Sequence, residues 1–186
     1  MTATIVTREP APPVRAHRRL LAAARCRFAE DRLADAVSAG IGQVLLVGTA
    51  LDTFCAHNPY HGLRVTRLAR VDETGMAAAG FDTRQATFII HLGGERTPSA
   101  LTATTCRVAA LAPGTELILD YLPDVTAPEL VATMLRDTGF AVLEDLDPRT
   151  LACRYLVLPD DVNHSAEPRI VRARVRHNVG RPPSSL

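Results

Sequence analysis

The amino-acid sequence predicts an α/β fold in which helices sandwich a mostly parallel β-sheet, with an antiparallel pair at its C-terminal end. Short apolar runs bounded by Gly or Pro alternate with longer segments of helical period, as is typical of such sheets. The 186 residues, 47% hydrophobic and 22% charged, suit one globular domain. We expect this domain to span residues 16–177, between flexible ends at residues 1–15 and 178–186.

The first half of the chain predicts one long helix and two strands. Apolar residues share a face over residues 16–39, which favours a helix lying on the sheet. Residues 43–47 are almost wholly apolar and predict a strand buried on both faces. Residues 63–68 are expected to form its neighbour, and Arg64 and Arg67 favour a place at an exposed edge.

The middle of the chain continues the alternation of strands and helices. A strand is expected over residues 86–92, followed by a helix with Thr97 as its N-cap and Pro98 in its first turn. A further strand is expected over residues 116–122. A capping box over residues 126–129 then predicts a helix that ends near Gly139.

The C-terminal part is expected to close the sheet. Residues 140–146 and 151–158, joined by Asp147 and Pro148, predict the antiparallel pair. Arginines alternate with apolar residues over 169–176, and this pattern predicts a basic edge strand or docking segment.

Ligands of mostly parallel sheets bind at the carboxyl ends of the strands. Three segments follow such ends in the predicted fold, at residues 48–57, 91–96 and 120–124. We therefore expect them to share one rim and to contain the functional site.

The composition argues against several classes of function. The net charge is only +1 and aromatic residues make up 4%, so nucleic acid is not an expected partner. All 21 basic residues are arginine, which excludes a lysine nucleophile. No apolar run approaches the roughly 20 residues that span a bilayer, and we expect a cytoplasmic protein without a membrane partner. The spacing of the four cysteines fits neither a metal site nor a disulfide framework; they are Cys26, Cys55, Cys106 and Cys153.

Several segments, in the same order, resemble one enzyme family. They are ARCRF at 24–28, GQVLLVGTALDTFCAHNP at 42–59, AGFD at 79–82, ALAPGTELILDYL at 110–122, GFAVLEDLDPRTLACRYL at 139–156 and VRAR at 171–174. The chain is similar over most of this span to the leucine carboxyl methyltransferase-like family of class I S-adenosylmethionine (SAM)-dependent methyltransferases, a family common in actinobacteria.

The resemblance implies a Rossmann-like methyltransferase sandwich that binds SAM and methylates an oxygen of a small molecule in specialised metabolism. In such enzymes a glycine-rich turn after the first strand approaches SAM, and an acidic residue ending the second strand accepts hydrogen bonds from the ribose hydroxyls. The matching positions predict four cofactor contacts at Arg25, Gly48, Asp52 and His57. Glycine and aspartate after a buried strand are also ordinary turn residues.

The sequence departs from the family pattern in the cofactor region. The pattern Gly-Ala-Gly-x-Asp has alanine at its second glycine, Ala50, and the family's Glu-x-Asp falls on Arg67, Leu68 and Ala69. The family's further helix, strand and acidic loop after this point are replaced by residues 71–76, and its long substrate-side insertion after Tyr121 is absent. Losing a charge-assisted contact costs about 1.5–3 kcal/mol, so these departures argue against tight SAM binding.

New polar residues stand on the predicted rim, where relatives are apolar or aromatic. His91 and Glu95 have the chemistry of a general base and its orienting acid, and Arg96 that of a carboxylate or oxyanion binder. A solvated loop with a histidine at a strand end is the alternative interpretation. No metal site is expected.

Three functions remain open from the sequence. The first is a small-molecule methyltransferase that uses SAM through a reduced pocket. The second is a SAM-independent enzyme on the same scaffold, such as a cyclase, isomerase or hydrolase acting through His91 and Glu95. The third is a non-catalytic pseudoenzyme that docks a partner protein or a second copy of itself along an exposed strand.

Overall fold

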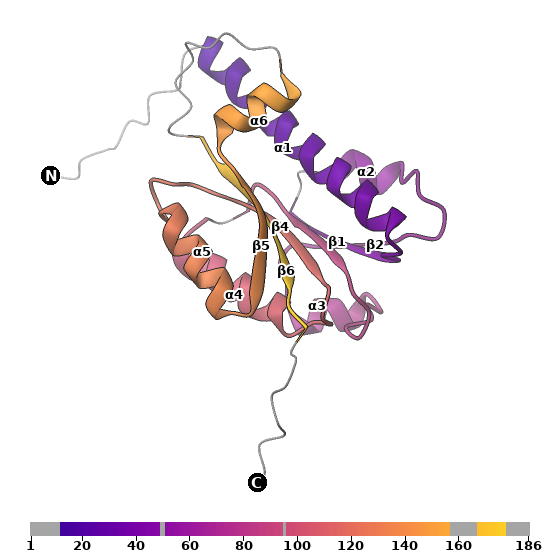
Figure 1. Ribbon diagram of the computed structural model, residues 1–186. Coiled ribbons are helices and arrows are strands. Elements are labelled where there is room, and N and C mark those ends of the chain that lie inside the picture. Colours follow the sequence, from indigo (N-terminus) through magenta and orange to yellow (C-terminus); the bar gives the residue numbers. More distant parts are fainter. Residues whose placement is uncertain (1–11, 49–50, 95, 157–166, 178–186) are drawn as a thin grey trace, which may run out of the picture.

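A six-stranded sheet forms the middle layer of the computed structural model (Figure 1), which describes residues 12–48, 51–94, 96–156 and 167–177. The strand order is β2-β1-β3-β4-β6-β5. The parallel part consists of β2 (Arg64–Leu68), β1 (Gln43–Val47), β3 (Phe88–His91) and β4 (Glu116–Tyr121). β6 (Arg169–Val175) runs antiparallel to both β4 and β5 (Phe140–Leu146). The predicted α/β class and mostly parallel sheet are confirmed.

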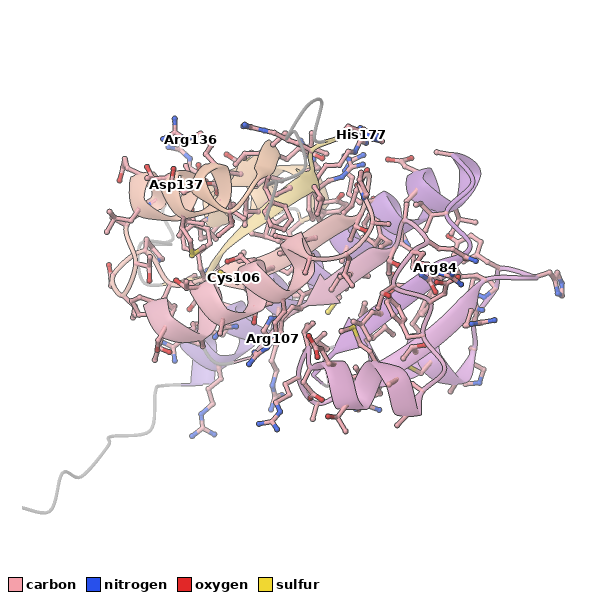
Figure 2. The ribbon with its side chains drawn as sticks, turned by 90° about the horizontal axis from the view of Figure 1, so that it is seen from below. Arg84, Cys106, Arg107, Arg136, Asp137 and His177 are labelled. Carbon is pink, nitrogen blue, oxygen red and sulfur yellow. The ribbon has the colours of Figure 1, made fainter. Side chains whose placement is uncertain are left out.

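Helices cover both faces of the sheet (Figure 1). On one face lie α1 (Pro12–Ser38), α2 (Asp52–Ala56) and α6 (Pro148–Tyr155), whose buried residues join those of the sheet in one apolar cluster. On the other lie α3 (Glu73–Ala78), α4 (Pro98–Ala109) and α5 (Pro128–Asp137), which contribute to a second cluster. Seen from below, α4 with Cys106 and Arg107 lies beside α5 with Arg136 and Asp137 (Figure 2).

The expected long first helix, four parallel strands and Thr97 cap are present. All five residues of β1 are buried, as the apolar run predicted, and β2 stands at the edge of the sheet. The Thr97 side chain accepts a hydrogen bond from the amide of Ala100, and proline occupies the first turn of α4. The expected ends at 1–15 and 178–186 lie outside the described residues except for 12–15 of α1. The turn residues Thr49 and Ala50, and Glu95, also lie outside them.

The predicted strand over 151–158 is wrong as far as the described residues reach. Residues 148–155 form α6 instead. The Asp147 side chain caps the helix by accepting a hydrogen bond from the amide of Thr150 at 2.7 Å, and the fixed φ of Pro148 suits a first helical turn. The antiparallel partner of β5 is β6 instead. Residues 157 and 158 are not among the described ones.

Two further predictions about the C-terminal half need correction. β6 is a strand, but it lies inside the sheet between β4 and β5 rather than at an edge. Its arginines are accommodated there because neighbouring strands supply carboxylates. The capping box is also wrong: α5 begins after Ala127 without a side-chain cap, and the hydroxyl of Thr126 is buried with no partner among the described residues.

A chain of ion pairs crosses the antiparallel half of the sheet. Glu116 of β4 is 5% exposed, and its two oxygens accept Arg172 Nε at 2.7 Å and Arg174 Nη2 at 2.6 Å. Arg172 also reaches Glu144 of β5 at 3.3 Å, and Glu144 pairs with Arg32 of α1 at 2.9 Å. Charges taken out of water need such partners, so this network ties three strands to α1.

Replacing Glu116 tests this network. Glu116→Ala leaves the mostly buried Arg172 without its nearest carboxylate, and we expect a loss of about 3 kcal/mol in the free energy of unfolding. Glu116→Gln keeps an acceptor and should lose less. Urea denaturation measures both, with Glu129→Ala on the exposed side of α5 as a near-neutral control. An equal, small effect of both Glu116 variants would contradict the structural role.

Candidate functional site

The carboxyl ends of β1, β3 and β4 meet at one rim, as expected from the sequence. Their parallel pairing aligns Val47 with His91 and His91 with Leu119. Just past the end of β3, the amide of Gly93 donates a hydrogen bond to Asp120 Oδ1, near the end of β4, at 2.9 Å. The three predicted rim segments therefore come together through their described residues.

Gly48 ends β1 in a conformation that favours glycine. Its φ is +90°, and a Cβ there would lie 3.2 Å from the carbonyl oxygen of Leu92. Its amide donates to the carbonyl of Leu68 at the end of β2. The need for glycine thus follows from the backbone turn and this close approach, whether or not a cofactor is bound.

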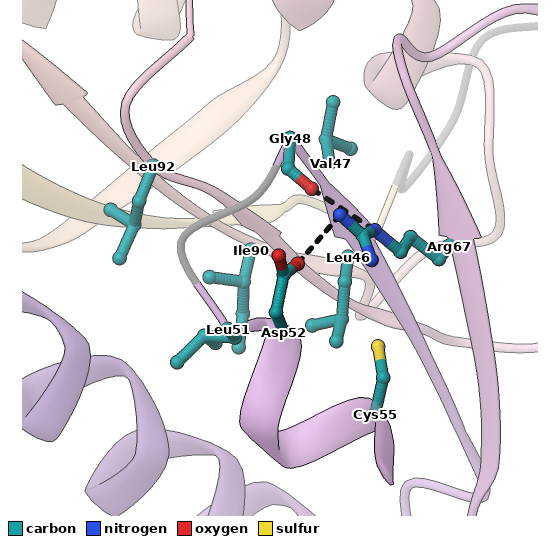
Figure 3. Close-up of a pocket in the computed structure, with 9 residues that line it drawn as sticks. All are labelled: Leu46, Val47, Gly48, Leu51, Asp52, Cys55, Arg67, Ile90 and Leu92. Atoms are coloured by element: carbon teal, nitrogen blue, oxygen red, sulfur yellow. Dashed lines mark hydrogen bonds and ion pairs between the residues drawn. The ribbon is translucent and has the colours of Figure 1, made fainter.

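Arg67 occupies the position where the resemblance implies a ribose-binding carboxylate. Its Nη2 pairs with Asp52 Oδ1 at 2.6 Å, and its Nε donates to the carbonyl oxygen of Gly48 at 3.3 Å (Figure 3). Two residues predicted as cofactor contacts, Gly48 and Asp52, are therefore engaged by a cation of the protein itself.

Little space remains beside this ion pair. The recess at the end of β1 has a volume of about 10 Å³, roughly the room that one water molecule needs. Its lining residues are Leu46, Val47, Gly48, Leu51, Asp52, Cys55, Arg67, Ile90 and Leu92 (Figure 3). The Arg67 and Asp52 side chains are 43% and 57% exposed, so the ion pair lies on the solvent side of the recess.

Asp120 is the centre of a second cluster on the rim. It is 3% exposed at the end of the wholly buried β4. Its Oδ2 accepts Arg96 Nη2 at 2.5 Å and lies 3.4 Å from Arg25 Nε of α1. Burial lowers the pKa of Arg25, Asp120 opposes that shift and Arg96 adds to it. The predicted residues Arg25 and Arg96 are thus brought together by an aspartate that had not been singled out.

His91 lies beside this cluster in a confined setting. Its Nδ1 is buried without a hydrogen-bond partner among the described residues, and an added Cβ at Gly94 would overlap its Nε2. Burial lowers the pKa of His91, Asp120 opposes the shift and Arg96 reinforces it. The imidazole is therefore held neutral near pH 7, as a general base requires. Its predicted partner Glu95 lies outside the described residues.

The fourth predicted cofactor contact, His57, is placed elsewhere. It is exposed just after α2 and lines a hollow of about 370 Å³ between α1 and the segment that follows α2. Tyr60 of that segment and Asp31 of α1 share this hollow. The structure does not bring His57 together with Gly48 and Asp52 in one recess.

Two polar groupings were missed by the sequence analysis. Asp120 could have been found, because a carboxylate at the end of the apolar run ELILDY must be paired when the strand is buried. The second grouping joins Tyr121, Asp145 and Arg169, with the Tyr121 hydroxyl donating to Asp145 Oδ2 at 2.8 Å. Burial and the Asp145 carboxylate raise the pKa of Tyr121, so it stays protonated.

In the part of the chain that the structure describes, no three His, Cys, Asp or Glu side chains are arranged to hold a metal ion. Nor does any helix in those ranges combine the length and apolar character that crossing a membrane requires.

Comparison with known proteins places this rim in a familiar fold. No protein-family model matches the chain, and no curated protein matches it. Among solved structures, one described as a SAM-dependent methyltransferase from Listeria monocytogenes aligns with a TM-score of 0.60 at 12% identity, over 85% of this chain and 99% of its own. Magnesium protoporphyrin IX methyltransferase from Synechocystis PCC 6803, with bound SAM, aligns with a TM-score of 0.56 at 16% identity. The alignment covers 91% of this chain and 86% of that structure. The domain StiE O-MT aligns with a TM-score of 0.53 at 10% identity, over 82% of this chain and 74% of its own.

The chain has the fold of the class I SAM-dependent methyltransferases. The expectation of a Rossmann-like sandwich is therefore confirmed. At these identities the likeness concerns the fold, and the chemistry of this chain has to be argued from its own rim.

The lowered pKa of His91 predicts a pH effect on stability. In the unfolded chain the pKa of the histidine is about 6.5, which is higher than the pKa of folded His91. Protonation therefore favours the unfolded state as the pH falls below about 6.5. Between about pH 7 and pH 5, the wild type should lose more unfolding free energy than His91→Gln, as measured by urea denaturation. His57→Gln, altered at an exposed site, should follow the wild type. Parallel curves for wild type and His91→Gln would refute the assignment.

Proposed function

We propose that this protein is a diverged relative of the leucine carboxyl methyltransferase-like lineage that acts on a small molecule of specialised metabolism without holding SAM at the ribose position. On this proposal a single domain over residues 16–177 works in the cytoplasm, and neither nucleic acid nor a membrane is its partner. The observation that carries the proposal is the Arg67–Asp52 ion pair across the turn after β1.

The chemistry of Arg67 opposes SAM more strongly than the ion pair itself does. Exposed ion pairs contribute only about 0–1 kcal/mol, so opening this one costs little. A guanidinium, however, offers only donors, so it cannot accept the hydrogen bonds that ribose hydroxyls would donate to a carboxylate at that place. Each lost charge-assisted hydrogen bond is worth about 1.5–3 kcal/mol, and the positive sulfonium of SAM gains nothing from a cationic neighbour.

The remaining parts of the rim favour a small-molecule role. Asp120, Arg96 and His91 bring buried polar atoms to the carboxyl ends of β3 and β4, which is the usual ligand position of open α/β sheets. A neutral histidine there supports proton transfer in a SAM-independent reaction. Methyl transfer from a SAM molecule bound in another way is the alternative, and it requires measurable SAM binding by the wild type.

Partner binding along β2 is a second candidate. β2 pairs only with β1 among the described strands, so its outer edge offers backbone groups to another chain. Its exposed arginines, Arg64 and Arg67, fold back to the carbonyls of Gly80 and Gly48. Charged side chains on an edge strand usually hinder pairing, which makes this candidate weaker than the first.

Reversing the charge at position 67 tests the proposal. Arg67→Glu restores an acceptor at the end of β2, and should bind S-adenosylhomocysteine at least about 10-fold more tightly than the wild type in isothermal titration calorimetry. The wild type should bind SAM and S-adenosylhomocysteine no more tightly than about 1 mM. Arg64→Glu makes the same charge change at the other end of β2 and should give no gain.

Two results would overturn this account of the cofactor position. The first is micromolar binding of SAM to the wild type, which would restore the methyltransferase interpretation. The second is an equal gain in Arg64→Glu and Arg67→Glu, which would show a general effect of net charge.

A further inference from the structure

We infer that Arg25 and Arg96, on either side of Asp120, bind the carboxylate group of the protein's small-molecule ligand. The inference rests on the proposed function, because it names the charged group by which the small molecule is recognised at the same rim. It differs from the proposed function in that it concerns the Asp120 cluster and not the turn that Arg67 contacts.

Unused hydrogen-bond donors are the first reason. Arg25 has a side chain that is 9% exposed, and its Nη1 is buried without a partner among the described residues. The Nε of Arg96 is also buried and unpartnered there. A buried donor without an acceptor costs about 1–3 kcal/mol, so two such donors around one carboxylate indicate that an acceptor belongs between them.

The charge of the cluster gives the second reason. Two guanidinium groups face the single carboxylate of Asp120. Among the described residues, the next carboxylate is that of Glu167, which is 2.9 Å from Arg18 and is thus paired with a cation of its own. Three arginines (Arg18, Arg25 and Arg96) thus face two carboxylates (Asp120 and Glu167), which leaves one positive charge in excess among these described side chains. One added anion would balance it.

The same arrangement selects the type of anion. Asp120 stays inside the cluster, bound to the amide of Gly93 and to Arg96. Its negative charge repels a dianion such as phosphate more strongly than a monoanion. A planar carboxylate also matches the two separate N–H donors that remain on the guanidinium groups.

Arg96 is the more accessible arginine of the cluster, since its side chain is 22% exposed while that of Arg25 is 9% exposed. Arg96 precedes the N-cap of α4, so its place is fixed by the start of that helix. The unpartnered Nδ1 of His91 adds a third polar atom beside the cluster. The ligand's carboxylate would thus enter past Arg96 and reach Arg25 at the inner end.

Acetate is the simplest probe of this site. Titrated at constant ionic strength, it should shift the ¹⁵N NMR signals of the Nε–H groups of Arg25 and Arg96, with saturable binding in the millimolar range. Acetamide, which has the same shape without the charge, should leave these signals in place. Arg96→Gln should weaken acetate binding at least about 10-fold. Arg84→Gln, altered at a side chain that is 92% exposed, should bind like the wild type.

Circular dichroism establishes whether Arg96→Gln is folded. If it is not, Arg96→Lys serves in its place, because it keeps the charge but loses the planar fork and should still bind acetate more weakly. The inference is overturned if acetate gives no saturable shift, if acetamide shifts the same signals equally, or if the folded Arg96 variant binds acetate as tightly as the wild type.

The outcomes separate the two proposals. SAM binding at micromolar concentration would overturn the proposed function, while the acetate titration alone decides the carboxylate site. Failure of acetate to bind, together with weak SAM binding, would overturn the carboxylate site and leave the proposed function standing.

Discussion

The buried carboxylate of Asp120 is the constraint around which the rim is organised. It stands at the end of β4, a strand that is buried along its whole length, and an unpaired charge there would be very costly. Three separate segments therefore supply partners: α1 through Arg25, the turn after β3 through Gly93, and the residue before the cap of α4 through Arg96. These contacts fix where the ends of two strands lie relative to the first helix.

The rim has two halves with different chemistry. At the end of β1 and β2, the protein satisfies its own groups, because Arg67 binds both Asp52 and the carbonyl of Gly48. At the end of β3 and β4, donors on Arg25 and Arg96 remain unused. In the half that the methyltransferase pattern assigns to the cofactor, the polar groups are thus paired with each other, while the other half retains unpartnered polar atoms. This contrast is why we place ligand recognition at Asp120.

Much of the fold could be predicted because local signals agreed with the packing. The apolar run of β1, the arginines of β2 at the sheet edge and the Thr97 cap of α4 each kept their predicted role. The closing pair failed because the prediction relied on the apolar run over residues 151–158, whereas Asp147 and Pro148 just before it are helix-start signals. β6 was predicted at an edge because its arginines suggested exposure to solvent. Only the tertiary structure shows the carboxylates of neighbouring strands that pair with these arginines.

The candidate site was harder to predict, because it depends on contacts between distant segments. Arg25 and Arg96 could be named from the sequence, but their meeting at Asp120 links residues 95 and 24 positions from it along the chain. The sequence showed that an arginine, Arg67, replaces the family's carboxylate, but it did not show that Arg67 pairs with Asp52. His57 was assigned to the cofactor by its position in a motif, and the short α2 carries it to a different hollow.

Native mass spectrometry of the protein, purified without added ligand from the cell that makes it, tests the central claim most directly. The account predicts that neither SAM nor S-adenosylhomocysteine accompanies the folded protein, and that any bound metabolite carries a carboxylate. Stoichiometric SAM or S-adenosylhomocysteine on the wild-type protein would contradict it, because Arg67 and Asp52 would then have to part and admit the nucleoside.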